Sequence, residues 1–217
     1  MPAITDLTGP AGRLEAVLDE PGGARDGQRP HAAVVFAHPH PQYGGTMNTR
    51  VVYQGAKGLS RFGCAVLRFN FRGIGLSAGE FDQGDGEKED FKAALDYMAG
   101  RYPDVRLWAA GFSFGSWVAL EVGAADQRVS ALIGIAPPVA TSLSGMKYEF
   151  PNTLASDKPK FFVQGESDEV CPLEALWTFY GRLQEPKELV VIDGADHLFG
   201  GKTTEVGEAL EDLLADF

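Results

Sequence analysis

Short apolar runs alternate with longer amphipathic segments along most of the chain. Six runs have the length, the β-branched or aromatic content and the glycine, proline or polar ends that are typical of strands. They cover residues 32–38, 64–71, 105–112, 129–136, 160–165 and 188–194. Several are apolar at consecutive positions rather than alternating, which is expected for central strands that are covered on both faces.

Between these runs the apolar positions recur with the period of an α-helix. The pattern predicts helices over residues 47–61, 86–102, 113–124, 172–183 and 203–214. An earlier segment, residues 12–20, alternates and predicts an edge strand beside a partner from the first few residues. The repeated alternation of strand and helix predicts a three-layer α/β fold, with a mostly parallel central sheet and helices on both faces.

A serine flanked by glycines follows the third predicted strand and opens the third predicted helix. Gly111 and Gly115 stand two residues before and after Ser113, which matches the strained strand-to-helix turn that exposes a nucleophile. Both positions require glycine because a Cβ there would strike the neighbouring helix and strand. An ordinary glycine-rich turn is the alternative, so the remaining catalytic groups have to decide between the two interpretations.

A serine nucleophile needs a general base, and in this architecture the order along the chain is serine, acid, histidine. The chain has four histidines, and His197 is the one that follows Ser113. His197 lies in the loop that leaves the last predicted strand, at the sheet edge where catalytic residues gather in such folds. We therefore predict His197 as the base.

The acid that orients the base is expected in the loop after residues 160–165. Three carboxylates compete there, and a fourth adjoins the histidine: Glu166, Asp168, Glu169 and Asp196. The spacing between Gly165 and Pro172 favours Asp168. Adjacent side chains rarely converge well enough for Asp196 to hydrogen-bond the ring of His197, so Asp168 is the predicted acid.

An oxyanion hole requires two backbone N–H groups that point at the substrate carbonyl oxygen. Phe114, directly after the nucleophile, is expected to supply one of them. The loop after residues 32–38 is expected to supply the other, and because Pro39 and Pro41 have no N–H, His40 is the nearest donor. Tyr43 is the alternative donor.

Taken together, these segments resemble the α/β-hydrolase superfamily, and most closely its small lidless branch near the dienelactone-hydrolase and prolyl-oligopeptidase-like groups. The matching segments are "GPAGRLEA", "HPHPQYGGTMNTRVV", "LRFNFRGIGLSAGEFDQGDGE", "GFSFGS", "GESDEVCP" and "DHLF". The resemblance implies the α/β-hydrolase fold without a cap domain and a triad of Ser113, Asp168 and His197. The dienelactone-hydrolase relatives use a cysteine nucleophile, so the serine here disfavours that activity.

Residues 137–159 form the longest connection between predicted elements, and they are too few for a helical cap domain. Aromatic residues and one methionine in and around this connection are candidates for a substrate pocket above the triad. They are Tyr43, Met146, Tyr148, Phe150 and Phe199. The alternative, which the sequence leaves equally open, is that these side chains pack on the edge of the sheet.

The His-Pro-His-Pro segment resembles the start of some zinc motifs, but no nearby aspartate and histidine complete such a motif. We therefore expect no metal and no cofactor. His38 is expected to be buried at the end of its strand, where it hydrogen-bonds the loop.

Composition and charge limit the class of partner. The chain of 217 residues has 30 acidic and 19 basic residues and a formal net charge of −11, which argues against nucleic acid and anionic membrane as partners. Two cysteines do not make a disulfide framework. No signal peptide is visible, and no apolar run approaches the roughly 20 residues that span a bilayer. A cytoplasmic protein with one domain over residues 1–217, monomeric or homodimeric, is the resulting expectation.

The chemistry that fits these residues is cleavage of carboxylic esters or thioesters of small soluble molecules through an acyl-enzyme on Ser113. Two alternatives use the same features. One is a hydrolase of short peptides or amides, and the other is a binding module that has retained the fold without catalysis. Because every catalytic position is filled, the binding module is the weaker alternative.

Overall fold

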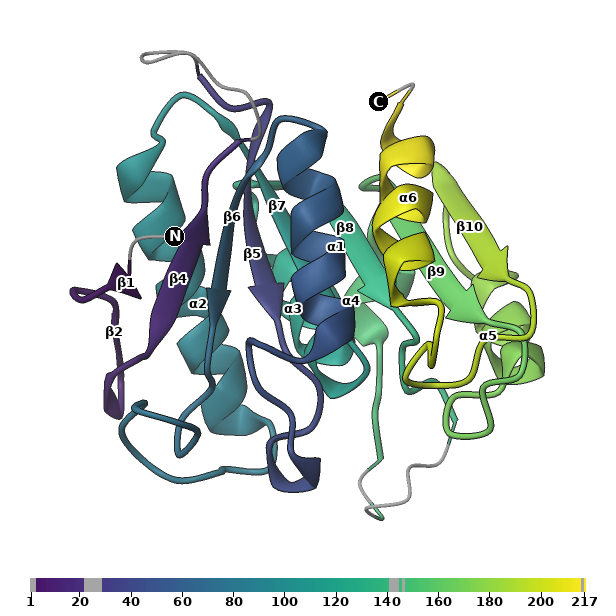
Figure 1. Ribbon diagram of the computed structural model, residues 1–217, viewed down its shortest axis with the longest axis horizontal. Coiled ribbons are helices and arrows are strands. Elements are labelled where there is room, and N and C mark those ends of the chain that lie inside the picture. Colours follow the sequence, from purple (N-terminus) through teal and green to yellow (C-terminus); the bar gives the residue numbers. More distant parts are fainter. Residues whose placement is uncertain (1–2, 22–28, 141–144, 146, 216) are drawn as a thin grey trace.

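An eight-stranded sheet forms the centre of the molecule in the computed structural model, which describes residues 3–21, 29–140, 145, 147–215 and 217 (Figure 1). Its strands, in spatial order, are β1 (Ala3–Ile4), β4 (Ala16–Asp19), β6 (Ala65–Phe69), β5 (Ala32–Ala37), β7 (Arg106–Phe112), β8 (Val129–Ile135), β9 (Lys160–Gly165) and β10 (Lys187–Ile192). From β6 to β10 all neighbours are parallel, whereas β4 is antiparallel to both β1 and β6. The prediction of a mostly parallel sheet is confirmed. A separate pair of short strands, β2 (Thr8–Gly9) and β3 (Gly12–Arg13), lies near the N-terminus.

Helices cover both faces of this sheet. The helices are α1 (Arg50–Arg61), α2 (Asp85–Arg101), α3 (Phe114–Ala125), α4 (Pro151–Ala155), α5 (Leu173–Tyr180) and α6 (Thr203–Leu214), with a short 3₁₀ helix η1 (Pro41–Tyr43). α1 and α6 cover one face of the sheet, and α2, α3 and α5 cover the other (Figure 1). The side chains of each group form a buried cluster with the face that it covers. Along β5 the buried side chains alternate between these clusters, so the strand is covered on both sides. The three-layer prediction is confirmed.

The alternating segment near the N-terminus was expected to lie at the edge of the sheet, and this part of the prediction is wrong. β4 pairs with β1 on one side and with β6 on the other, so β1 is the outermost strand. The expected partner from the first few residues is confirmed. A buried ion pair accommodates the one charged side chain of β4, because Arg68 of β6 donates to Asp19 of β4 at 2.5 Å.

The carboxyl ends of β5, β7, β9 and the loop after β10 lie at one edge of the sheet, because these strands run in the same direction. This edge is the lower one in Figure 1. All the predicted catalytic residues belong to loops at this edge. None of the helices in the described ranges combines the length and apolar composition that crossing a membrane would require.

Candidate active site

Ser113 occupies a strained turn between β7 and α3. Its backbone angles are φ 52° and ψ −122°, in a region that residues with a Cβ rarely adopt. The N–H of Ser113 donates to the carbonyl oxygen of Ile135 at 2.9 Å, and its own carbonyl oxygen accepts from the N–H of Ser116 at 2.8 Å. These bonds to β8 and to the first turn of α3 hold the strained residue in place.

The two glycines that flank Ser113 allow α3 to pack directly against the strands. A Cβ on Gly111 would lie 2.1 Å from the carbonyl oxygen of Gly115, and a Cβ on Gly115 would lie 2.3 Å from the carbonyl oxygen of His38. Both distances are far below van der Waals contact, and the obstructing atoms belong to the backbone. The prediction that both positions require glycine is confirmed.

Ser113, His197 and Asp168 come together at the carboxyl edge of the sheet. Nε2 of His197 lies 3.1 Å from Oγ of Ser113, and Nδ1 of His197 lies 2.8 Å from Oδ2 of Asp168. The ring of His197 also lies 5.2 Å from the ring of Phe112, centroid to centroid, so packing limits its rotation. Because the carboxylate accepts at Nδ1, that nitrogen carries the proton, and Nε2 is free to accept from the serine hydroxyl.

The carboxylate of Asp168 accepts four hydrogen bonds in a fully buried position. Oδ1 accepts from the N–H groups of Val170 at 2.9 Å and Cys171 at 2.7 Å. Oδ2 accepts from Nε2 of Gln164 at 3.0 Å in addition to His197. Both oxygens therefore act only as acceptors, which is the arrangement of a carboxylate that orients an imidazole.

The competing carboxylates are directed elsewhere. Oε2 of Glu166 accepts from the N–H of Gly194 at 2.8 Å, and Oδ1 of Asp196 accepts from the N–H of Gly200 at 2.8 Å. Glu169 is exposed. Of the four candidate acids, Asp168 is the one that hydrogen-bonds His197.

The two predicted oxyanion donors follow adjacent strands, Phe114 at the start of α3 after β7 and His40 in the loop after β5. Phe114 is the first residue of α3, so its N–H has no acceptor within the helix. His40 follows β5, which pairs with β7, and its ring lies 5.1 Å from the ring of Phe114. The alternative donor, the N–H of Tyr43, already donates to the carbonyl oxygen of His40 at 3.1 Å. His40 thus stays the better candidate for the second donor.

His38 connects the loops that follow β5 and β6. It is fully buried; its Nδ1 lies 2.6 Å from the carbonyl oxygen of Pro39, and its Nε2 lies 3.0 Å from the amide nitrogen of Phe71. Since Nε2 accepts from this N–H, Nδ1 carries the ring proton and donates it to Pro39. Burial lowers the pKa of His38 to about 4, so the ring is neutral near pH 7. The expectation of a buried, loop-bonding histidine is confirmed.

Replacing His38 with glutamine is expected to weaken the dependence of the free energy of unfolding on pH between pH 4 and pH 7. The unfolded ring binds a proton below its ordinary pKa of 6.5, whereas the folded ring does not until about pH 4. The wild-type free energy of unfolding therefore falls by about 3 kcal/mol from this group as pH drops through that window. Urea titrations between pH 4 and pH 7 measure it, and equal slopes for the two proteins would contradict the assignment.

The residues predicted to line a pocket do not gather around one cavity. Phe199 is fully buried against Phe112, in the cluster that includes α1 and α6. Phe150 packs against Phe179 in the other cluster, with ring centroids 4.9 Å apart. Tyr43 is 66% exposed. Met146 lies outside the described residues. The prediction of a shared pocket is therefore wrong for Phe150 and Phe199, which are buried in separate clusters, and it stays a prediction for Tyr43 and Tyr148.

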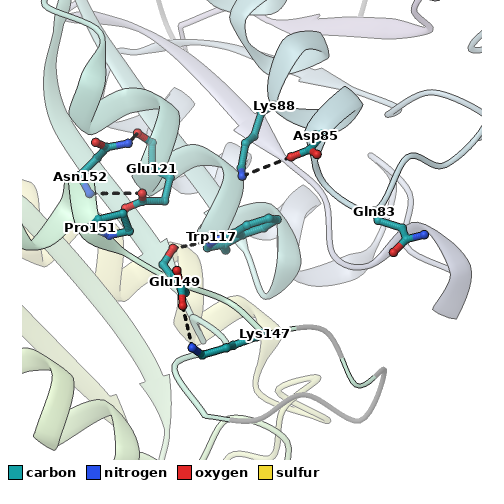
Figure 2. A pocket seen from close by; sticks show the side chains of 9 residues that line it. All are labelled: Gln83, Asp85, Lys88, Trp117, Glu121, Lys147, Glu149, Pro151 and Asn152. Carbon is teal, nitrogen blue, oxygen red and sulfur yellow. Dashed lines mark hydrogen bonds and ion pairs between the residues drawn. The ribbon is translucent and has the colours of Figure 1, made fainter.

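Tyr148 packs against Trp117, which lines a cavity that the sequence did not reveal (Figure 2). Its ring lies 5.1 Å from that of Trp117 and 6.3 Å from that of Phe114. The cavity beside Trp117 has a volume of about 540 Å³. It is lined by Gln83, Asp85, Lys88, Trp117, Glu121, Lys147, Glu149, Pro151 and Asn152. Trp117 stands one helical turn, roughly 6 Å, after the nucleophile along α3.

The indole ring of Trp117 is held as a fixed wall of this cavity. Its Nε1–H donates to the carbonyl oxygen of Glu149 at 2.9 Å, and Nζ of Lys88 lies 4.2 Å from the ring centroid (Figure 2). Lys88 also lies 3.9 Å from Asp85, a highly exposed partner. The ammonium–aromatic contact and the hydrogen bond fix the ring in one orientation. The sequence signal, an apolar residue at helical spacing, also fits an ordinary core position.

Metal-ligating side chains come close together at one place in the described ranges. The ligand atoms of Asp168, Cys171 and His197 lie within 4.8 Å of one another. Two of these residues already hydrogen-bond each other, so this group coincides with the candidate catalytic residues. Both ring nitrogens of His38 hydrogen-bond the backbone, so neither is free to bind a metal ion.

Comparison with known proteins gives consistent results. Residues 30–216 match the model of a family described as an alpha/beta hydrolase domain. An alpha-beta serine hydrolase homologue from Coxiella burnetii is 39% identical, with a TM-score of 0.87 over 98% of this chain and 97% of that one. A serine hydrolase without a lid from Xanthomonas campestris is 33% identical, with a TM-score of 0.87 over 99% and 94% of the two chains. An esterase from Pyrococcus furiosus shares the fold at 24% identity, with a TM-score of 0.75 over 98% and 92%.

Proposed function

The chain belongs to the alpha/beta hydrolase family, and from its site we propose that it cleaves carboxylic esters or thioesters through an acyl-enzyme on Ser113. The observation that carries the proposal is the chain of hydrogen bonds from Asp168 through His197 to the serine on its strained turn. This arrangement supplies a nucleophile, a base and a group that orients the base. An esterase from Pyrococcus furiosus shares the fold of this chain, which agrees with the proposal.

In the first half of the reaction, Oγ of Ser113 attacks the ester carbonyl carbon while Nε2 of His197 takes the hydroxyl proton. The carbonyl oxygen becomes an oxyanion, which accepts hydrogen bonds from the N–H groups of Phe114 and His40. The tetrahedral intermediate then collapses, the bond to the alcohol or thiol breaks, and His197 gives its proton to the leaving group. The positive dipole at the start of α3 also favours the anion.

In the second half, water replaces the alcohol. His197 takes a proton from the water as its oxygen attacks the acyl carbon, and a second oxyanion occupies the same site. Collapse breaks the bond to Oγ and returns the proton from His197 to Ser113. Throughout both halves Asp168 stabilises the imidazolium and keeps Nδ1 protonated.

A fluorophosphonate probe tests this proposal directly, because it labels an activated serine. The wild-type protein is expected to bind the probe covalently at Ser113, whereas Ser113→Ala is expected to bind none. Ser60→Ala is the matched control, since Ser60 lies on α1 and donates to the carbonyl oxygen of Glu20. If the folded wild-type protein is not labelled, the proposal fails. A p-nitrophenyl ester and a matching anilide then separate esterase from amidase activity.

We further propose that the cavity beside Trp117 receives the acyl or alcohol part of a small-molecule substrate. Support comes from Trp117, which follows Ser113 by one helical turn on α3 and lines the cavity with its indole ring (Figure 2). Apolar groups that reach this surface gain binding free energy in proportion to the area that they bury. Short acyl groups end before the cavity and gain nothing from it.

Trp117→Ala is therefore expected to lower kcat/KM about tenfold for p-nitrophenyl hexanoate or benzoate but to leave the acetate nearly unchanged. Trp177→Ala is the matched control, because Trp177 is 51% exposed on α5. Parallel kinetics across the ester series measure the effect. A uniform loss for all chain lengths would show that the indole supports the fold rather than the substrate.

A further inference from the structure

Gln164 is a fully buried polar residue near the end of β9 that the reaction steps above do not use. Its Nε2 donates two hydrogen bonds, to Oδ2 of Asp168 at 3.0 Å and to the carbonyl oxygen of Cys171 at 2.7 Å. Its Oε1 is buried and has no hydrogen-bond partner among the described residues. A buried amide that satisfies one atom and leaves the other unpaired needs an explanation.

The two acceptors around Nε2 fix the orientation of the amide. A flip would place Oε1 against the carboxylate of Asp168 and the carbonyl oxygen of Cys171, so two hydrogen bonds would be replaced by two repulsive contacts. The amide group therefore cannot gain a partner for Oε1 without losing both bonds. The observed orientation keeps both hydrogen bonds of Nε2 and leaves Oε1 without a partner among the described residues.

The bonds of Gln164 act on the atom that orients the catalytic base. Oδ2 of Asp168 accepts both from Gln164 and from Nδ1 of His197. Meanwhile Oδ1 is held by the N–H groups of Val170 and Cys171. Gln164 thus fixes the second oxygen of a carboxylate whose first oxygen is fixed by the loop, and the carboxylate has one position.

We propose that Gln164 is a positioning residue of the active site, which holds Asp168 and moderates its charge toward His197. The inference rests on the proposed function, because it assigns Asp168 and His197 their catalytic roles. A hydrogen-bond donor to a carboxylate spreads its negative charge and weakens its attraction for a neighbouring imidazolium. Without the donor, the carboxylate attracts the protonated ring more strongly and moves more freely.

The other titratable groups around this pair are few and engaged. Burial raises the pKa of the Cys171 thiol, which stays uncharged. Glu166 and Asp196 accept from backbone N–H groups of the loop after β10. Glu169 is exposed to water. Gln164, on β9, is therefore the side chain besides His197 that hydrogen-bonds the carboxylate of Asp168.

Gln164→Met keeps the length of the side chain and removes both donors. We expect kcat to fall tenfold to a hundredfold, as for other losses of catalytic alignment. We also expect the acid limb of the pH profile of kcat/KM to move to higher pH, because the imidazolium is stabilised. A residue that supports only the fold would lower the melting temperature without moving this limb.

Gln164→Glu serves as the second variant, because it keeps the shape and adds a charge. Next to the buried Asp168 the new carboxyl is held protonated at low pH and donates one O–H. Ionisation at higher pH sets two carboxylates side by side, so we expect activity to fall at alkaline pH where the wild type retains it. Rescue at low pH but not at high pH is the signature of a required donor.

The experiment measures kcat and kcat/KM for p-nitrophenyl acetate from pH 5 to pH 9 for both variants and the wild type, with melting curves for each. Glu169→Gln is the matched control, because it changes an exposed side chain of the same loop. The Nδ1 proton resonance of His197 is followed by NMR, which requires no substrate, and is expected to shift in both variants.

Wild-type kcat and an unmoved acid limb in Gln164→Met overturn the inference. So do an unshifted Nδ1 resonance and an alkaline limb in Gln164→Glu that matches the wild type. A wild-type protein without Ser113-dependent hydrolysis instead overturns the proposed function, and that result is obtained before any Gln164 variant is compared. If Gln164→Met does not fold, the isosteric Gln164→Glu decides alone.

Discussion

Replacing Asp168 with asparagine is expected to lower kcat about 10⁴-fold while the fold remains intact. The single oxygen of asparagine is drawn to the position of Oδ1, where it accepts from the N–H groups of Val170 and Cys171. Its NH₂ group then faces Nδ1 of His197 and forces that nitrogen to accept. The proton moves to Nε2, which can no longer take the proton of Ser113.

The surroundings of Asp168 make the expected fall in kcat larger than loss of the negative charge alone would cause. Nε2 of Gln164 donates to the same oxygen position, so the NH₂ group of asparagine would meet a second donor there. Neither amide can turn to relieve the contact without losing bonds to the backbone. Removal of the charge, the wrong tautomer of His197 and the donor–donor contact each lower kcat.

Single-turnover kinetics with p-nitrophenyl acetate measure the effect on acylation, and melting curves check the fold. Glu166→Gln is the matched control, because it removes another carboxylate from the same loop. That carboxylate accepts from the N–H of Gly194 and not from His197. Its kcat is expected to stay within twofold of the wild type. An Asp168→Asn enzyme that retained a tenth of its activity would point to another acid as the orienting group.

The sequence was sufficient for the features that follow from chain order and local backbone requirements. The Gly-x-Ser-x-Gly turn predicts its own geometry, because the glycine positions are set by contacts within the same strand–turn–helix unit. His197 followed from chain order and from its place in the loop after the last predicted strand, since one histidine lies after Ser113. The alternation of apolar runs of strand length with helical segments predicted the mostly parallel sheet. The scarcity of polar positions in those runs indicated that the strands are covered on both faces.

The pocket and the residues behind the triad were not predictable in the same way. Whether a loop aromatic points into a cavity or into the core depends on tertiary packing, and Phe199 and Phe150 both point into the core. Trp117 reads as an apolar helix position, although its ring forms a cavity wall. Gln164 reads as a polar position in a strand. Its role depends on where Asp168 and Cys171 lie in space, which no spacing in the sequence specifies.

Adding a single methyl group at Gly115 is expected to destabilise the protein by about 3 kcal/mol or more. The new Cβ would lie 2.3 Å from the carbonyl oxygen of His38 and 2.6 Å from that of Ala37, both at the end of β5. Backbone atoms in a central strand cannot move aside as a flexible side chain can. α3 must therefore shift away from the sheet, and the buried contacts between them are lost.

The matched control for Gly115→Ala is Gly100→Ala, which adds the same methyl group to another helix. Gly100 lies in the last turn of α2, and an added Cβ there meets no atom within 4 Å. Alanine has the higher helix propensity, so this variant is expected to gain about 0.5–1 kcal/mol. Urea unfolding of the two variants against the wild type measures both changes. Equal stabilities would mean that α3 and β5 are not in the close contact on which Ser113 and the N–H of Phe114 depend for their positions.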